Sequence, residues 1–484
     1  MPLDHAVLTR LARSVAGEVL QPADPGFAAA RAGAVWNGAI TRQPALIVRP
    51  TSAEEVARTL AVVREEGVDL TVRGGGHSGA GNAVAEDAVM IDLSRIAGVR
   101  VDAEAHRVHV GGGATLAAVD AATAPLGLAV AGGTVSHTGV SGLTLSGGLG
   151  WLTSQQGLAC DNLVAATLVT ADGRTVTASE DTEPELFWAL RGAGTNFGIV
   201  TELVFAPHEL NPLANVGMFF WRPDDALEPL RFLREYLFDL PAGITGAVVG
   251  MSAPPEPFVP EEHRGERGVA VLVAGWGSAE EHAAAIRPLR ERDPLFEMVT
   301  PIPHVALQQM LDDANPWGIR AYDKGLNLDR LSDDALAVIL ERLPLMRSPL
   351  SYVPMFPLTG RYSEISDDAT AWGSPRRPHW ALALLAMAPD DESYAADRAW
   401  VRDLWNALRP YAPDDGTYLN FEADTDDRRV RASYGERKYR RLAELKAVWD
   451  PDNVFRHNPN IPPAPAGIPS PREAVPARTG GTVR

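Results

Sequence analysis

Residues 132–150 read GGTVSHTGVSGLTLSGGLG, and seven of these nineteen positions are glycine. Glycine usually makes up about 7% of a protein, so this density is far above the ordinary level. Each glycine adds backbone freedom that must be lost on folding, and a packed core gains nothing in return. The segment therefore predicts a place where the backbone comes close to a large flat or anionic ligand.

Two more glycine-rich segments flank it, RGGGHSGAG at residues 73–81 and GAGTNFGIVT at residues 192–201. Glycines in the first let backbone N–H groups approach an anion. It is not a P-loop, because no Gly-Lys-Ser/Thr ends it. It is not a Rossmann fingerprint either, because residues 84–93 predict a strand where a helix would have to begin. One such segment alone could be a glycine-rich turn that binds no ligand. Three of them in one part of the chain favour a site that holds a cofactor.

The distribution of apolar residues divides the chain near residue 206. Before this point the pattern predicts strands at 44–49, 69–73, 88–93 and 107–111, helices at 52–66 and 114–124, and a hairpin at 168–178. After it, predicted strands at 216–221, 244–251, 269–276 and 380–388 alternate with predicted helices at 227–238, 278–292, 332–346 and 392–409. The second part is typical of an antiparallel sheet backed by helices.

A chain of 484 residues is too long for one small core, and we expect two domains. Residues 1–206 form the N-terminal part of the first, and residues 207–414 form the second, which binds substrate. Residues 415–462 are predicted to return to the first domain, because a loop-like sequence rich in asparagine, DPDNVFRHNPNI, follows at residues 450–461. Residues 463–484 are predicted to be a disordered tail.

The charge and cysteine content exclude several classes of partner. A formal net charge of −18 disfavours nucleic acid and anionic membrane surfaces. No uncharged apolar run of about 18 residues predicts a membrane span, and the N-terminus lacks the apolar core of a signal peptide. The lone cysteine, Cys160, excludes an internal disulfide and multi-cysteine metal sites, and we predict no metal. A cytoplasmic location fits these features.

Five segments carry a family resemblance: RGGGHS (73–78), GGTVSHTGVSGLTLSGGLGWL (132–152), GLACDNLV (157–164), RGAGTNFGIVT (191–201) and DPDNVFRHNPNI (450–461). Together they resemble the berberine-bridge-enzyme-like flavoprotein oxidoreductases, of the vanillyl-alcohol-oxidase and p-cresol-methylhydroxylase type. The resemblance implies an α+β fold with a two-part FAD-binding domain. It also implies a substrate domain whose antiparallel sheet, backed by helices, covers the isoalloxazine ring.

The same resemblance implies the residues that hold FAD. Its pyrophosphate would lie on the loop that Arg73 begins, formed by Gly74, Gly75, Gly76, Ser78 and Gly79. The cofactor would further be lined by Thr134, Val135, Thr138, Gly139, Gly142, Gly147, Gly148 and Gly150. Its adenine and ribose side would meet Gly194, Gly198 and Val200, and Asn458 and Asn460 would reach it from the C-terminal return.

Covalent attachment of the cofactor is expected at one point. In the family pattern, His77 is the residue bonded to the 8α-methyl carbon of the flavin. Many relatives add a second bond from the cysteine of a Gly-Thr-Cys-Pro motif, and here Val135 takes the place of that cysteine. Cys160 lies in a different motif and is interpreted as a buried structural residue. The prediction is FAD bound through His77 only.

The catalytic residues are expected opposite the flavin. Tyr418 and Asn420, in YLNF, match a family segment beside the ring, and Tyr418 is the candidate for the base or for orienting the substrate. A tyrosine base needs a nearby cation, which Arg376 and Arg377 could supply unless they form a solvated pair. His137 either faces the site or is bonded in the core. Two aromatic residues, Trp317 and Tyr322, either line the pocket or belong to the core.

The predicted function is an FAD-dependent oxidoreductase that removes a hydride from an alcohol, amine or hydroquinone-like carbon of a small molecule. Thr138, three residues beyond the missing cysteine, favours molecular oxygen as the electron acceptor. A sugar or oligosaccharide oxidase is the alternative among enzymes, and an open aromatic groove would favour it. A flavin-bearing sequestration protein without turnover is the alternative from another class.

Overall fold

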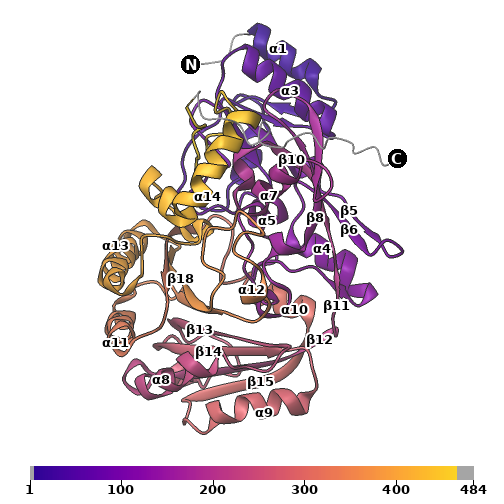
Figure 1. Cartoon of the computed structure of the whole chain (residues 1–484). Helices are drawn as coiled ribbons and strands as arrows, with labels where there is room; N and C mark the ends of the chain where they lie inside the picture. Colours follow the sequence, from indigo (N-terminus) through magenta and orange to yellow (C-terminus); the bar gives the residue numbers. More distant parts are fainter. Residues whose placement is uncertain (1–4, 466–484) are drawn as a thin grey trace, which may run out of the picture.

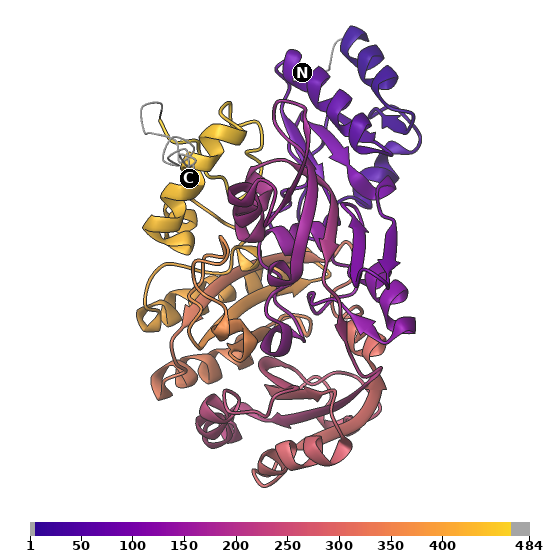
Figure 2. The same ribbon diagram turned by 45° about the vertical axis from the view of Figure 1, so that its right-hand side comes forward.

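The computed structural model describes residues 5–465, which form two lobes (Figure 1). The lobe that includes the N-terminal helices holds two small sheets, and the other is built on one large sheet. Figure 2 shows the same division from another side. Within residues 5–465, no helix combines the length and apolar character needed to cross a membrane.

The first sheet has the strand order β1-β2-β4-β3. Its strands are β1 (Glu18–Leu20), β2 (Leu46–Arg49), β3 (Leu70–Arg73) and β4 (Val89–Asp92), and β4 runs parallel to both β2 and β3. Around it lie α1 (His5–Ser14), α2 (Phe27–Ala32) and α3 (Ala53–Glu65). Ser52 begins α3 by accepting a hydrogen bond from the Glu55 N–H, as its residue type predicts.

The second sheet is antiparallel, with the order β5-β6-β10-β8-β9. Its strands are β5 (Val99–Asp102), β6 (Arg107–Gly111), β8 (Leu163–Val169), β9 (Thr175–Ser179) and β10 (Ile199–Phe205). The predicted hairpin is confirmed as β8 and β9. The same lobe holds α4 (Leu116–Thr123), α5 (Val140–Leu145), α6 (Thr153–Gln156), α7 (Pro184–Ala193) and the short pair β7 (Leu128–Ala129) and β11 (His208–Glu209).

The third sheet is antiparallel, with the order β15-β12-β14-β13-β17-β18-β16. Its strands are β12 (Leu213–Trp221), β13 (Ile244–Ser252), β14 (Arg267–Gly275), β15 (Phe296–Pro303), β16 (Arg320–Leu328), β17 (Val353–Leu358) and β18 (His379–Ala388). Helices α8 (Leu227–Tyr236), α9 (Ala279–Arg290), α11 (Asp333–Arg342) and α13 (Asp391–Leu408) supply the core on one of its faces. Figure 1 shows α8 and α9 on the side away from the first two sheets. The shorter α10 (His304–Gln309) and α12 (Arg361–Glu364) lie in the connections.

Side chains alternate between the two faces of this sheet, as strand geometry requires. Phe219, Val248 and Leu384 belong to the core beneath the helices. Their neighbours Met218, Val249 and Leu385 line a cavity on the other face. The predicted α+β fold, with an antiparallel sheet backed by helices, is thus present.

The C-terminal return consists of α14 (Asp427–Trp449) and the segment that follows it. Helix α14 packs against α7, and both figures show it beside the N-terminal lobe. The buried Lys446 ammonium donates to the carbonyls of Asn196 and Phe455, at 2.7 and 2.9 Å, and to the Asp450 carboxylate at 2.6 Å. This lysine therefore ties the return to the third glycine-rich segment.

Two predicted elements differ from the structure, and one prediction cannot be compared. Residues 84–93 were expected to form a strand, but only Val89–Asp92 do so. The preceding residues belong to a long loop that connects the parallel β3 and β4 without a helix. The helix expected at 332–346 ends at Arg342, where a 3₁₀ turn containing Pro344 follows. The predicted tail lies, from residue 466 on, outside the described residues.

Candidate active site

A cavity of about 1280 Å³ opens between the glycine-rich segments and the third sheet. Residues within 74–79, 133–146, 195–200 and 455–459 line one side, and side chains from β12, β13, β14, β15, β16, β17 and β18 line the other. Pockets for drug-sized ligands occupy about 300–1,000 Å³. This cavity therefore has room for a large molecule, or for a large and a small one together.

Glycines allow the loops of this cavity to pack against one another. A Cβ added at Gly75 would lie 2.2 Å from the Cα of Gly139, and one added at Gly139 would lie 2.4 Å from the Cα of Gly75. Gly76 has a φ of +73°, a conformation that side chains rarely adopt. Gly142 has open space where a side chain would stand. The backbone is thus exposed to the cavity along both loops.

The structure brings together at the cavity most of the residues that the sequence singled out. They are His77, Gly74, Gly75, Gly76, Ser78, Gly79, Thr134, Val135, Thr138, Gly139, Gly142, Gly198, Val200, Asn458, Tyr418 and Asn420. These residues come from both halves of the N-terminal lobe and from the C-terminal return. Chain segments more than 300 residues apart therefore share one site.

Four of the predicted glycines do not line the cavity, which corrects their assignment as cofactor contacts. Protein atoms occupy the place of a Cβ at 2.1–2.6 Å in three cases: Trp372 at Gly147, the Gly132 carbonyl at Gly150, and Leu145 at Gly194. The fourth, Gly148, has a φ of +93° and donates its N–H to the Tyr418 hydroxyl oxygen at 3.0 Å. These glycines make room for neighbouring protein.

Arg73, His137 and Asn460 also lie outside the cavity lining. The Arg73 guanidinium pairs with Asp92 at 3.3 Å and donates to the carbonyls of Gly33 and Gly75, so it braces the loop that it begins. The His137 ring packs 4.9 Å from the His77 ring. Asn460 Oδ1 is buried without a hydrogen-bond partner in the described part of the chain.

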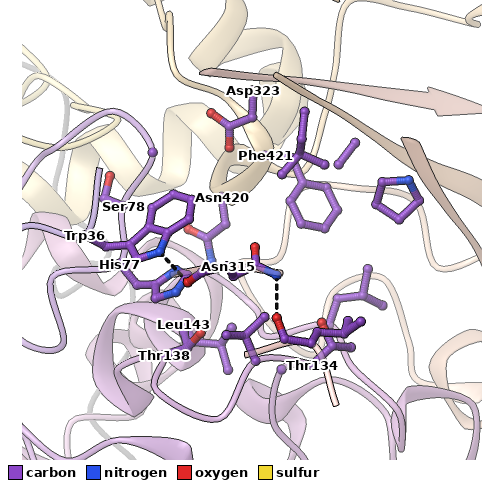
Figure 3. Close-up of a pocket in the computed structure, with 18 of the residues that line it drawn as sticks. Trp36, His77, Ser78, Thr134, Thr138, Leu143, Asn315, Asp323, Asn420 and Phe421 are labelled. Carbon is purple, nitrogen blue, oxygen red and sulfur yellow. Dashed lines mark hydrogen bonds between the residues drawn. The ribbon is translucent and has the colours of Figure 1, made fainter. Parts of the chain in front are cut away.

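His77 lies within a cluster of rings at the edge of the cavity. Its imidazole stacks on the Trp36 indole with the centroids 4.6 Å apart (Figure 3), and the centroid of the His137 ring lies 4.9 Å away. Burial lowers the pKa of His77 to about 3, and the neighbouring His137 adds to this effect. Nε2 is buried and has no hydrogen-bond partner among residues 5–465. The ring is therefore neutral at ordinary pH, with a nitrogen free to react.

The two positions relevant to a sulfur link are both unsuited to it. Val135 lines the cavity where many relatives have a cysteine, and its side chain cannot form a thioether. Cys160 is completely buried among Leu149, Leu158 and Tyr418, outside the cavity lining. Burial raises the pKa of the Cys160 thiol, so it stays protonated.

Tyr418 and Asn420 lie together at the cavity. The Tyr418 hydroxyl oxygen accepts the N–H of Gly148 at 3.0 Å and the amide of Asn420 at 2.8 Å. Burial raises the pKa of Tyr418 to about 12, although both of these donors act in the opposite direction. The hydroxyl is thus held in place rather than prepared to lose its proton.

The two arginines considered as partners of Tyr418 are bound elsewhere. Arg376 donates to both carboxylate oxygens of Asp161, at 2.7 and 2.9 Å, and Arg377 pairs with Asp329 at 2.6 Å. Tyr322 faces the core beneath the helices, where its hydroxyl donates to Asp424. Neither arginine is therefore paired with Tyr418, and Tyr322 belongs to the core, which is one of the two alternatives for it. Trp317 lies outside the cavity lining, half-exposed, with its ring 6.5 Å from that of His77.

Comparison with known proteins agrees with this geometry. Residues 44–179 match a family model described as an FAD binding domain, and residues 417–462 match one described as berberine and berberine like. An FAD-linked oxidoreductase of Dictyostelium discoideum is 30% identical over 434 residues, which are 88% of this chain and 91% of that protein. The chain belongs to the berberine-bridge-enzyme-like family of FAD-linked oxidoreductases.

Two further relatives share nearly the whole length of the chain. The (R)-6-hydroxynicotine oxidase of Paenarthrobacter nicotinovorans is 30% identical over 475 residues, 93% of this chain and 97% of that protein. The crystal structure of 6-hydroxy-D-nicotine oxidase from Arthrobacter nicotinovorans superposes with a TM-score of 0.81 at 28% identity, covering 92% of this chain and 98% of that one. The present chain is therefore an FAD-dependent oxidoreductase with the same two-lobed fold.

The residues present fit FAD. The Gly74–Gly79 loop offers bare backbone for the pyrophosphate, and Gly142 leaves space for a flat ring. Five cavity-lining residues carry buried polar atoms without a partner in the described chain, namely Thr71 Oγ1, His77 Nε2, Trp151 Nε1, Asp323 Oδ1 and Asn458 Oδ1. Such atoms are costly unless a ligand satisfies them. Within residues 5–465, no group of three or more His, Cys, Asp or Glu side chains could hold a metal ion.

One cavity residue of this oxidoreductase escaped the sequence analysis. Asp323, on β16, is buried and lines the cavity beside the loop of His77. In the sequence, Tyr322-Asp323-Lys324 shows only that neighbouring residues of a strand face opposite sides of the sheet. Because all three side chains carry polar atoms, the pattern does not show which of them faces the cavity. The side chain that faces the cavity became evident only from the sheet register.

Proposed function

We propose that this enzyme is an oxidase that holds FAD covalently through His77 alone and oxidises a small apolar molecule, with molecular oxygen as the electron acceptor. The observation that carries the proposal is the neutral His77 ring at the edge of a cavity lined by bare backbone, with an Nε2 that has no hydrogen-bond partner among residues 5–465. Bound FAD supplies the hydride acceptor, which no amino-acid side chain provides.

The attachment relies on the state of His77. A nucleophilic nitrogen needs a free lone pair, and burial keeps this imidazole unprotonated at neutral pH. Trp36 and His137 hold the ring from its two sides. FAD would supply the methyl carbon for this bond. His77 would give up its ring hydrogen and the methyl group one hydrogen, and molecular oxygen would take up both, with their electrons, as hydrogen peroxide. Val135 and the inert Cys160 support a single bond.

The cavity wall favours an apolar substrate over a sugar. Four methionines from the substrate side line it, Met218, Met251, Met298 and Met310, together with Phe356 and Phe421. Methionine adapts to apolar ligands of irregular shape, whereas a sugar needs many hydrogen-bonding partners. The lining therefore supports the small-molecule substrate over the oligosaccharide.

We assign Tyr418 and Asn420 to orienting the substrate. The raised pKa of Tyr418, about 12, makes its hydroxyl a hydrogen-bond donor at neutral pH and a poor base. Asn420 fixes the direction of this hydroxyl through its amide. Thr138, which lines the cavity with a small polar side chain, supports access of oxygen to the same space.

Acid precipitation of the purified protein tests the attachment. The expected result is a yellow pellet that keeps its flavin in denaturant, and a His77→Ala variant that releases it all. His109→Ala is the matched control, because this histidine lies outside the cavity lining and pairs with Glu202 at 3.3 Å, and its pellet stays yellow. Flavin that washes off the wild-type protein would contradict the proposal.

Turnover needs a second experiment. Anaerobic mixing with a panel of aromatic alcohols, amines, hydroquinones and oligosaccharides is expected to bleach the flavin with an apolar member of the panel, and air is expected to restore the colour. Bleaching by oligosaccharides alone would favour the sugar oxidase. A flavin that no compound bleaches would favour the sequestration protein.

A further inference from the structure

The Asp323 carboxylate projects into the cavity beside the loop that carries His77. Its side chain is 9% exposed, and a Cβ added at Gly79 would lie only 2.6 Å from Oδ1. In Figure 3 it stands on the opposite side of the view from Thr134 and Thr138, with its oxygens toward the middle of the cavity. Oδ1 has no hydrogen-bond partner among the described residues. The carboxylate thus lies where a substrate would meet it.

The charged neighbours of Asp323 are all occupied. Glu422 accepts from Arg429 at 2.7 Å and from Lys324, so both of these cations are bound to another carboxylate. Asp424 accepts from the Tyr322 hydroxyl at 2.7 Å and from Arg402 at 3.0 Å. No ion pair to Asp323 occurs within residues 5–465.

Two phenols also lie near Asp323. Tyr394 donates its hydroxyl to the Ala321 carbonyl at 3.5 Å, and burial raises its pKa. The second phenol is Tyr352. Its hydroxyl donates to the Asn315 side-chain oxygen at 3.2 Å, and burial raises its pKa to about 12, so it stays neutral. Burial, and next the charge of Glu422, raises the pKa of Asp323 to about 7. An ionised Asp323 therefore leaves an uncompensated negative charge against apolar walls, which is unfavourable unless a cation joins it.

We propose that the substrate is an apolar amine, and that Asp323 binds its protonated nitrogen and then removes one proton from it. This inference deepens the proposed function and rests on it. The ammonium group supplies the positive charge that Asp323 has no partner for among residues 5–465, while the methionine and phenylalanine side chains contact the apolar body of the substrate.

The proton transfer balances without another reactant. One N–H bond of the ammonium breaks, an O–H bond forms on the Asp323 carboxylate, and the nitrogen keeps the electron pair. The neutral amine is then ready to lose a hydride from the adjacent carbon, because its lone pair stabilises the cation that results. FAD, when bound, would supply the acceptor for that hydride and its two electrons, and Asp323 would retain the proton until the product leaves.

An alcohol fits this position less well. A hydroxyl group is neutral, so the Asp323 charge stays uncompensated when an alcohol binds. Its proton is also held much more tightly than that of an ammonium group, and a carboxylate is a weak base for it. The geometry therefore favours nitrogen over oxygen at the reacting carbon.

Binding of matched probes to the flavin-loaded enzyme tests the proposal. We choose 1-naphthylmethylamine and 1-naphthylmethanol, which differ only in the reacting group, and anaerobic titration calorimetry at pH 8. The amine is expected to bind at least about tenfold more tightly than the alcohol. Asp323→Asn keeps the shape and removes the charge, and should bring this ratio close to one. Asp313→Asn is the matched control, an exposed aspartate at the cavity that should keep the preference.

The pH dependence of the wild-type enzyme gives a second measurement that needs no variant. Asp323 gains its proton as the pH falls through about 7, so amine affinity should fall about tenfold between pH 8 and pH 6, while alcohol affinity stays constant. Equal binding of both probes by the wild type, or a preference that survives in Asp323→Asn, would overturn the proposal. A flavin that washes off would refute the proposed covalent attachment and leave this binding preference standing, whereas a flavin that alcohols reduce and amines do not would overturn the amine proposal.

Discussion

The two faces of the seven-stranded sheet are built from alternate residues of the same strands and have opposite properties. The face under α8, α9, α11 and α13 holds a closed core with fully buried Phe219, Trp380 and Leu384. The other face lines a large cavity and carries an unpaired carboxylate, Asp323. One face maintains the fold and the other is shaped for ligands. Substitutions on the two faces should therefore separate stability from binding.

The largest effect is expected from a phenylalanine on the helix-covered face. Phe219→Ala should lower the free energy of unfolding by about 3–5 kcal/mol, because it leaves a cavity in a closed core. Phe356→Ala, on the cavity face, removes the same atoms from a half-buried position and should cost less than half as much. Urea unfolding followed by circular dichroism measures both. Equal losses would break the comparison.

The next effect depends on pH and concerns the cavity face. The pKa of Asp323 is raised to about 7 in the folded state, from about 3.9 when unfolded, so the folded state binds its proton more tightly. The contribution of Asp323 to the free energy of unfolding is therefore most favourable below about pH 4, and it is lost as the pH rises through about 7. Asp323→Asn escapes this loss and should be more stable than wild type at pH 8, by up to about 4 kcal/mol.

Unfolding of the ligand-free enzyme between pH 4 and pH 8 measures this difference. The variant and the wild type should have similar stability at pH 4 and diverge toward pH 8. A constant difference across the range would show that Asp323 is not the titrating group.

The smallest effect concerns the adjacent residue on the opposite face. Tyr322→Phe removes a hydroxyl that donates to Asp424 and accepts from Arg402, and should cost about 1 kcal/mol at all pH values from 5 to 8. Probe binding in the cavity should not change. A selective loss of probe affinity would show that the two faces communicate.

The glycine-rich segments predicted the cofactor site because each glycine costs conformational entropy on folding, and close approach of the backbone to a ligand explains that cost. They could not predict which glycines meet the ligand, since Gly139 makes room for another loop at the cavity and Gly194 makes room for Leu145 away from it. A glycine at the cavity and a glycine packed against neighbouring protein cannot be told apart in the sequence. Glycine density therefore located the region and not the contacts.

The ends of the helices could be predicted from the sequence, whereas the register of the strands could not. The apolar period predicted α3 and α13 nearly to the residue, because local capping and amphipathic spacing determine them. The strand register, which aims Asp323 into the cavity and Tyr322 away from it, depends on pairing between distant strands. The cytoplasmic location and the domain boundaries stay predictions.

The bond network of Lys446 has a consequence for how this enzyme is made in the cell. It joins the segment around Phe455 to Asn196, and the same return supplies Asn458 to the cavity. A growing chain on the ribosome lacks this wall until translation has passed residue 459. The lobe that begins the chain is thus among the last to be finished, since residues 455–459 complete the lining of its cavity.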